Sequence, residues 1–95
     1  MADVRFEWDP KKADANLKKH RVSFEEAVTV FFDENALLIN DPDHSDEEER
    51  FILMGFSDRL RILVVSHCYR RNDQIIRIIS ARSASKAERR QFYQR

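Results

Sequence analysis

The sequence has few of the residues that break or crosslink a chain. It holds one cysteine, one glycine and two prolines in 95 residues. A single cysteine excludes an intrachain disulfide and is consistent with a reducing, cytoplasmic location. Because glycine and proline are scarce, we expect mostly regular secondary structure with short connections.

Long apolar runs and several common motifs are also missing. No apolar run approaches the roughly 20 residues that span a bilayer, and the N-terminus lacks the apolar stretch of a secretory signal. Neither a glycine-rich phosphate loop nor an HExxH motif is present, so nucleotide hydrolysis and zinc peptidase chemistry have no support. The chain is 42% hydrophobic and 36% charged. This composition favours one soluble domain over residues 1–95.

The net charge of zero conceals two opposite halves. Residues 1–49 contain 6 Lys/Arg against 14 Asp/Glu, whereas residues 50–95 contain 11 Lys/Arg against 3 Asp/Glu. Ten of those eleven basic residues are arginines, whose forked guanidinium suits phosphate contacts. The basic half is therefore compatible with binding nucleic acid, although the total charge of the chain is neutral.

The first twenty residues predict a strand and a helix. Residues 4–8 alternate apolar and charged side chains, which is typical of a short strand. Asp9 and Pro10 provide a helix cap followed by proline at the first helical position. We expect this helix to present Ala13 and Leu17 as its apolar face. The helix also carries a polar stripe that comprises Lys12, Asn16, Lys19 and His20. This stripe is either a solvated face or a contact with RNA or a partner.

A second helix follows at once. Ser23 and Glu26 have the spacing of a capping box, in which each side chain bonds the other residue's backbone N–H. Apolar residues then recur at helical spacing. We expect all of them to fill the core: Phe24, Ala27, Val28, Phe31 and Phe32.

The remaining chain predicts four strands and a final helix. The strands are expected at residues 36–40, 50–56, 60–70 and 74–81, with an acidic loop over 41–49. Short turns join the last three strands, which indicates an antiparallel meander. Ser85 and Glu88 form another capping box, which opens a helix to about Gln94. The order is β-α-α-β-β-β-β-α in one α+β domain.

Polar side chains gather near the ends of the last two strands. Strict alternation would place Ile76, Ile78, Ser80 and Arg82 on one face of the last strand, and Ile75, Arg77, Ile79 and Ala81 on the other. In the preceding strand it would place His67 and Tyr69 opposite Cys68 and Arg70. Strand ends beside a helix N-terminus can form a pocket with oriented N–H donors.

These polar residues could support RNA cleavage. Cleavage without a metal needs a base for the 2′-OH proton, cations for the phosphate and an acid for the leaving oxygen. His67 or Glu88 could be the base or acid, and Arg70, Arg82 and Arg89 could be the cations. However, arginines at strand ends are commonly surface charges, and Glu88 is already explained as a helix cap. The residues alone leave both interpretations open.

Two further features of the sequence give weaker evidence for a functional site. His44 lies among the carboxylates of the acidic loop, which could hold a divalent cation, but the spacing matches no ordered metal-binding loop. Cys68 lies in an apolar strand without a second cysteine or a basic partner, so we expect a buried side chain rather than a nucleophile. We therefore expect neither a metal nor a cofactor.

Four blocks of the sequence, in order, resemble a known family. They are FEWDPKKADANLKKH (6–20), VSFEEAVTVFFD (22–33), RILVVSHCYR (61–70) and IRIISARSASKAER (76–89). Together they resemble the BrnT toxins of bacterial type II toxin–antitoxin systems. The resemblance implies a RelE-like fold, a twisted antiparallel sheet with two N-terminal helices packed on one face and a C-terminal helix.

The same resemblance implies a function and its partners. It implies a metal-independent ribonuclease that inhibits translation and growth. It also implies neutralisation by a ribbon-helix-helix antitoxin in a hetero-oligomer, with operator DNA contacted only through the antitoxin. The alternative is a non-catalytic RNA-binding or antitoxin-binding regulatory module.

Functional positions of the family fall on Arg70, Arg82, Glu88 and Arg89 in this chain. His67 stands where the family pattern tolerates an aromatic residue or histidine. We therefore expect catalysis to depend on the first three residues before His67. The side chains expected to bind RNA are Arg77, Arg89, Arg90, Tyr93 and Lys19.

Overall fold

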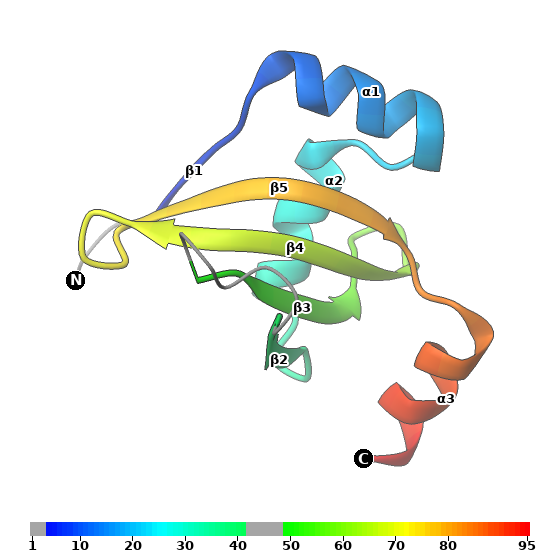
Figure 1. The fold of residues 1–95 in the computed structure, drawn as a ribbon. Helices are drawn as coiled ribbons and strands as arrows, with labels where there is room; N and C mark the ends of the chain where they lie inside the picture. Colours follow the sequence, from blue (N-terminus) through cyan, green and yellow to red (C-terminus); the bar gives the residue numbers. More distant parts are fainter. Residues whose placement is uncertain (1–3, 42–48) are drawn as a thin grey trace.

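The structure, a computed structural model, describes residues 4–41 and 49–95. It confirms the α+β class and the predicted order of helices and strands (Figure 1). No helix in these two ranges is long and apolar enough to cross a membrane. The elements are β1 (Arg5–Glu7), α1 (Pro10–His20), α2 (Phe24–Thr29), the 3-10 helix η1 (Val30–Phe32), β2 (Leu37–Asn40), β3 (Phe51–Phe56), β4 (Ile62–Arg70), β5 (Ile75–Ser83) and α3 (Lys86–Gln94).

The strands form one five-stranded sheet in the order β1-β5-β4-β3-β2. β3, β4 and β5 form the antiparallel meander that the short turns predict, and β2 extends it by pairing antiparallel with β3. β1 instead pairs parallel to β5, with Arg5 beside Ile75 and Glu7 beside Arg77. No local pattern in the sequence predicts this parallel pair. The chain then crosses from one edge of the sheet to the other through α1 and α2 before it enters β2.

Each face of the sheet carries its own hydrophobic cluster. α1 and α2 cover one face, which we call the α1/α2 face, and α3 covers part of the other, which we call the α3 face (Figure 1). The first cluster includes Val22, Phe24, Ala27, Val30, Leu63, Val65, Ile78 and Ala81. The second comprises Met54, Ile62, Val64, Ala84 and Phe92. The two N-terminal helices therefore share one face, as expected.

A β-bulge between β4 and β5 decides which residues of β5 share a face. Ser66 pairs with Ser80 and His67 pairs with Ile78, so Ile79 is an extra residue on β5. Paired residues in a sheet lie on the same face, and one extra residue inverts the alternation beyond it. The second half of β5 is therefore turned over relative to the first half.

This bulge overturns the strict alternation expected for the strand. Ala81 lies in the same buried cluster as Ile78, although alternation placed them on opposite faces. Arg82 pairs with Val64, which belongs to the cluster on the α3 face. Arg82 therefore shares the α3 face with Arg77, and the sequence-based assignment of these two arginines to opposite faces is wrong.

The second helix ends earlier than predicted. α2 ends at Thr29, and η1 continues the chain through Phe32. Phe24 and Ala27 are fully buried as predicted, but Phe32 is 75% exposed, so its assignment to the core is wrong. A 3-10 helix has three residues per turn rather than 3.6, which rotates Phe32 out of the apolar stripe.

The capping box predicted for α2 forms in one direction only. The Ser23 hydroxyl accepts from the N–H of Glu26 at 3.0 Å. The Glu26 carboxylate instead accepts from the Ser57 hydroxyl at 2.7 Å and from Nε of Arg61 at 3.0 Å. The Arg61 guanidinium, with a smaller contribution from Ser57, holds the pKa of buried Glu26 below its usual value despite desolvation. Glu26 thus joins α2 to the β3–β4 turn.

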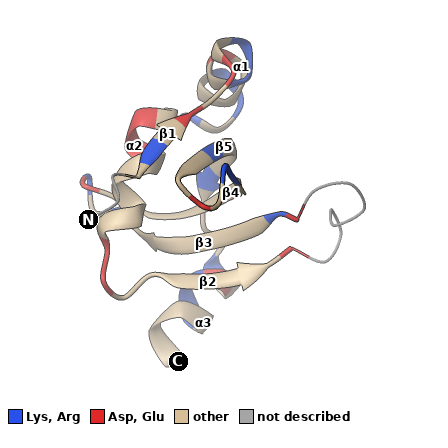
Figure 2. Cartoon of the chain, turned by 90° about the vertical axis from the view of Figure 1, so that its left-hand side faces the viewer, with Lys and Arg blue, Asp and Glu red and all other residues tan. Residues whose placement is uncertain are grey.

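The acidic and basic halves of the sequence mix in space. Acidic residues mark α2, whereas basic residues mark both α1 and the β4–β5 part of the sheet (Figure 2). Lys18, Lys19 and His20 form the last turn of α1, although they belong to the acidic half of the chain. Basic residues on α1 and on the β4–β5 part of the sheet therefore come from both halves of the sequence.

Candidate active site at the junction of β5 and α3

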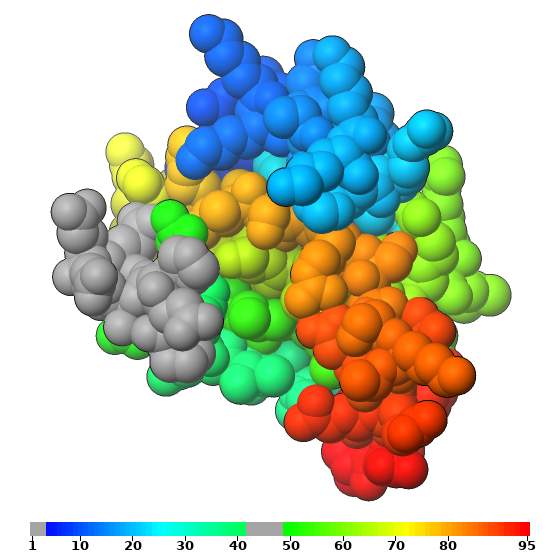
Figure 3. Space-filling view, turned by 45° about the vertical axis from the view of Figure 1, so that its right-hand side comes forward, coloured from blue at the N-terminus to red at the C-terminus, as the bar shows by residue number. Residues whose placement is uncertain are grey.

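Arg82 and Glu88 form a charged pair where β5 passes into α3. Two guanidinium nitrogens of Arg82 donate to the two carboxylate oxygens of Glu88, at 2.7 and 2.9 Å. Arg82 comes from the end of β5 and Glu88 from the first turn of α3. The two elements form one surface that adjoins α1 (Figure 3). Such two-point geometry is the one arginine uses with carboxylates and phosphates.

Glu88 also caps α3. The Ser85 hydroxyl accepts from the N–H of Glu88 at 3.1 Å, and the Glu88 carboxylate accepts from the N–H of Ser85 at 2.8 Å. The capping box predicted for this helix is therefore confirmed. The hydrogen bonds from Arg82, with a smaller contribution from Ser85, lower the pKa of Glu88 to about 2. The carboxylate is ionised at neutral pH, so it can accept a proton but has none to donate.

Arg89 and Tyr93 extend the charged pair along α3. Arg89 donates to the Ala84 carbonyl at 2.9 Å, which holds its guanidinium against the start of the helix. Tyr93 is 66% exposed, and its ring lies 6.3 Å from that of Phe56. A shallow hollow of about 280 Å³ lies between these two helix residues and Leu60 of the β3–β4 turn. A cation, an aromatic ring and an apolar side chain therefore line one depression.

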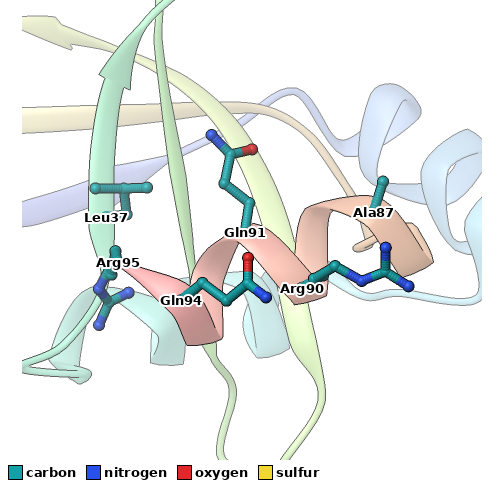
Figure 4. A pocket seen from close by; sticks show the side chains of 6 residues that line it. All are labelled: Leu37, Ala87, Arg90, Gln91, Gln94 and Arg95. Carbon is teal, nitrogen blue, oxygen red and sulfur yellow. The ribbon is translucent and has the colours of Figure 1, made fainter.

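A second groove lies on the other side of α3. Its volume is about 480 Å³, and it runs between α3 and the edge strand β2 (Figure 4). Arg90, exposed on α3, lines it at some distance from Leu37 of β2. The other lining residues are Ala87, Gln91, Gln94 and Arg95. The arginines Arg89 and Arg90 thus serve different depressions on either side of one helix.

His67 lies in the core of the α1/α2 face. Its side chain is fully buried, and its ring lies edge-on to Phe31 at 4.9 Å. Its Nε2 lies 3.3 Å from the Tyr69 hydroxyl. Burial lowers the pKa of His67, which keeps the ring neutral at pH 7. Because Arg82 lies on the α3 face, the structure does not bring His67 to it, and a direct role for His67 as base or acid there is not supported.

Arg70 and Arg77 share the α3 face with Arg82 but lie toward the opposite end of the sheet. Arg77 pairs with Glu7 at 2.7 Å, and Arg70 lies 3.9 Å from the same carboxylate. Arg70 is six positions along β4 from Val64, the partner of Arg82, or about 20 Å at 3.3 Å per strand residue. Arg70 therefore does not belong to the compact Arg82–Glu88 cluster.

Comparison with known proteins decides the family. The family model for BrnT, the ribonuclease toxin of a type II toxin–antitoxin system, matches residues 8–88. The chain belongs to the BrnT family. The chain is similar to the crystal structure of the Brucella abortus ribonuclease toxin BrnT, with a TM-score of 0.66 and 25% sequence identity. The alignment covers 87% of this chain and 99% of the Brucella chain. No curated protein matches the chain.

BrnT membership confirms the resemblance seen in the four sequence blocks. It makes the chain a ribonuclease toxin of a type II toxin–antitoxin family, with RNA as the target and an antitoxin as the partner. The matched range contains both Arg82 and Glu88.

The polar stripe expected on α1 of this BrnT chain divides into two parts. Lys19 is exposed, as either interpretation of the stripe requires, but Asn16 is only 7% exposed. Conversely Leu17, expected on the apolar face, is 46% exposed. Lys19 follows Asn16 by one turn, so it lies on the side of α1 that meets β5. An asparagine among lysines looks solvated in the sequence, and no local signal marked it as buried.

The other sequence signals do not add to the site. Cys68 is buried, as predicted. Within residues 4–41 and 49–95 no three possible metal ligands lie together. His44 and most of the acidic loop fall in residues 42–48, which lie outside the described residues.

Proposed function

We propose that this BrnT-family toxin cleaves RNA without a metal ion, and that Arg82, held by Glu88, is its working centre. Family membership supports RNA as the target. The observation that carries the site is the two-point Arg82–Glu88 pair at an open strand–helix junction. The Arg82 side chain is 44% exposed, so a phosphate can approach it while Glu88 holds it in place.

Arg82 would bind the scissile phosphate and stabilise the charge that builds on it. A guanidinium has five N–H donors, and Glu88 occupies two donor nitrogens of Arg82. One further N–H makes a long contact with the Ser83 carbonyl, and the remaining donors would be available to a phosphate approaching from solvent. A cation fixed before the reaction begins stabilises developing charge without reorganising. Arg89, next to Glu88 on α3, would supply a second positive charge.

The chemistry we propose is attack of the ribose 2′-oxygen on phosphorus. The new bond joins phosphorus to the 2′-oxygen, the bond to the 5′-oxygen breaks, and the 2′-OH proton ends on the leaving 5′-oxygen. We expect products with a 2′,3′-cyclic phosphate and a 5′-hydroxyl. Glu88 is a weak base at a pKa of about 2, so its main role would be to orient Arg82, while solvent carries the proton.

Other basic residues would bind the RNA outside this centre. Exposed Lys19 and Arg90 would contact phosphates, as would the guanidinium groups of Arg70 and Arg77 on the α3 face. Tyr93, two thirds exposed beside Arg89, would stack on a base, a contact that tolerates any sequence.

The antitoxin would act on the same surface. We propose a ribbon-helix-helix protein that forms a hetero-oligomer with this chain in the bacterial cytoplasm and covers the arginines with an acidic segment. Operator DNA would be contacted through the antitoxin alone. Co-expression of such a partner should restore the growth that the toxin stops.

Expression of the chain alone, followed by RNA analysis, tests the proposal. Growth should stop, and purified protein should cleave RNA equally well with and without EDTA. Arg82→Ala should lower cleavage by roughly 100-fold or more, the usual cost of losing a donor to developing charge. Arg59→Ala, which removes an exposed arginine of the β3–β4 turn, is the matched control and should keep full activity. Undiminished cleavage by a folded Arg82→Ala variant would contradict the site, and loss of cleavage in EDTA would contradict metal independence.

A non-catalytic RNA-binding module is the second candidate. Two observations favour it: His67 lies on the opposite face of the sheet from Arg82, and Glu88 is held ionised. This candidate predicts RNA retention that weakens with salt but no cleavage products. End-labelled RNA incubated with the wild-type protein separates the two.

A further inference from the structure

The buried amide of Asn16 bonds both backbone groups of one residue of β5. Its Nδ2 donates to the Ala81 carbonyl at 2.8 Å, and its Oδ1 accepts from the Ala81 N–H at 3.1 Å. Nδ2 also donates to the Val22 carbonyl at 2.9 Å. An amide offers two donor hydrogens and one acceptor oxygen, so every part of this side chain is engaged.

Asn16 occupies the place of a missing strand. β1 pairs with β5 only as far as Arg77, and beyond that point β5 has β4 on one side alone among the described residues. The N–H and C=O of Ala81 point to the unpaired side, where a neighbouring strand would normally bond them. Asn16 supplies the donor and the acceptor that such a strand would provide.

The bonded residue is the one that precedes Arg82. Ala81 also lies just beyond the bulge at Ile79, where the alternation of β5 is inverted. Because side chains in a strand alternate, a slip of one residue here would carry Arg82 to the α1/α2 face, away from Glu88. The position of Arg82 therefore depends on what holds Ala81 in register.

We propose that Asn16 is a positioning residue, whose amide locks β5 at Ala81 in its register beyond the bulge and thereby holds Arg82 against Glu88 on the α3 face. The third bond, to Val22, anchors this lock to the connection between α1 and α2. The functional part of the inference rests on the proposed role of Arg82 in RNA cleavage. The geometric part concerns only the fold.

The test must separate positioning from stability, because removing a buried amide leaves the Ala81 N–H and C=O without partners and destabilises any fold. Asn16→Ala is compared with Val22→Ala. Val22 is fully buried in the same cluster, and truncating its side chain leaves its carbonyl and all three amide bonds intact. Both variants are measured at a temperature where each remains folded.

The first readout is the titration of the Glu88 carboxyl by NMR, which needs no RNA. In the wild type its pKa should be about 2. In Asn16→Ala it should rise toward 4.5, the ordinary value, because Arg82 no longer pairs with it, whereas Val22→Ala should keep the low value. The second readout is the kcat for RNA cleavage. It should fall roughly tenfold or more in Asn16→Ala, because small displacements of a catalytic group are costly. In Val22→Ala the kcat should change little.

Each outcome has a defined meaning. A low Glu88 pKa together with full cleavage in folded Asn16→Ala would overturn the inference. If Asn16→Ala fails to fold, Asn16→Asp replaces it, since that side chain still accepts from Ala81 but donates to neither carbonyl. Slow hydrogen exchange of the Ala81 amide is expected in the wild type. Fast exchange would contradict the hydrogen bond between the Ala81 N–H and Asn16, and with it the inference. If the wild type cleaves no RNA while the Glu88 pKa still rises in Asn16→Ala, the positioning stands and the proposed function fails.

Discussion

Two arginine–glutamate pairs in this protein share their chemistry but differ in their surroundings. Glu26 pairs with Arg61 and accepts also from Ser57. The Glu26 side chain is only 5% exposed, whereas that of Arg61 is 35% exposed. In the second pair, Arg82 and Glu88 have side chains 44% and 30% exposed. The two arginines are similarly exposed, so the pairs differ chiefly in their carboxylates: Glu26 is buried between α2 and the β3–β4 turn, whereas Glu88 is partly open to solvent.

The difference also appears in what each arginine does with its remaining donors. Arg61 donates to the Arg21 carbonyl at 3.2 Å as well as to Glu26, so it ties α1, α2 and the β3–β4 turn together. Arg82 has one further long contact, 3.4 Å to the Ser83 carbonyl of its own strand. We infer that the Arg61 pair maintains the fold and the Arg82 pair serves the ligand.

The largest effect should follow from breaking the Glu26–Arg61 pair, whose carboxylate is buried. Arg61→Ala leaves the buried Glu26 carboxylate without its cation, and removing one partner of a buried pair lowers the free energy of unfolding by about 3–5 kcal/mol. Urea denaturation measures this loss. Arg59→Ala, two residues earlier and exposed, should change stability by about 0.5 kcal/mol or less. Equal stability of the two variants would contradict the structural role of Arg61.

Replacing each glutamate by glutamine should sharpen the contrast. Glutamine can still cap α3 at the position of Glu88, so Glu88→Gln should lose only the charge-assisted bonds from Arg82, about 1.5–3 kcal/mol of the free energy of unfolding. The same change should reduce RNA cleavage roughly tenfold or more, because Arg82 loses the charge that orients it.

Glu26→Gln is the matched comparison. It should lower stability more than Glu88→Gln, since its partner bonds are buried, while leaving the kcat of the folded protein unchanged. The two variants are compared by denaturation and by cleavage of labelled RNA. The idea of two separate roles fails if Glu88→Gln cleaves RNA as fast as the wild type.

Lowering the pH should weaken both arginine–glutamate pairs. The pKa of Glu88 falls from 4.5 in the unfolded chain to about 2 in the fold. A carboxylate with a lowered folded-state pKa stabilises the fold above its unfolded pKa, and this stabilisation is lost as the pH falls toward the folded value. The difference in free energy of unfolding between wild type and Glu88→Gln should therefore shrink between about pH 4.5 and pH 2.

The pH series has an internal control. The pKa of Glu26 is also lowered, chiefly by its hydrogen bonds from Arg61. The Glu88→Gln variant should thus retain an acid-dependent loss of stability that belongs to Glu26. Denaturation curves at a series of pH values measure both terms, and a difference that does not vary over this range would contradict the ion pair at Glu88.

The smallest effect concerns Leu60, which directly precedes Arg61. Its φ is 61°, and its side chain is 80% exposed. Left-handed backbone is costly for leucine but not for glycine, so Leu60→Gly should raise the free energy of unfolding by about 0.5–1 kcal/mol. Leu38→Gly is the control: it removes another exposed leucine, but from strand β2, and should be destabilising. A loss of stability in Leu60→Gly would show that the leucine makes contacts that outweigh the backbone strain.

Local sequence signals determined much of this protein. Hydrophobic periodicity and turn residues were enough for the order of helices and strands, since both act over a few neighbours. The Ser85–Glu88 capping box was predicted for the same reason, because its two hydrogen bonds span three residues. The charge asymmetry and the four sequence blocks identified the basic C-terminal half and the family.

Only the tertiary structure decided which charged residues meet. The bulge at Ile79 turned Arg82 to the α3 face, and pairing across strands sets a bulge. Asn16 found its partner at Ala81, 65 residues away, which no local pattern specifies. His67 became a core residue because Phe31 packs over it. Periodicity along one strand assigns faces correctly only until a neighbouring strand shifts the register, and at the junction of β5 and α3 that shift determines which residues the proposed site contains.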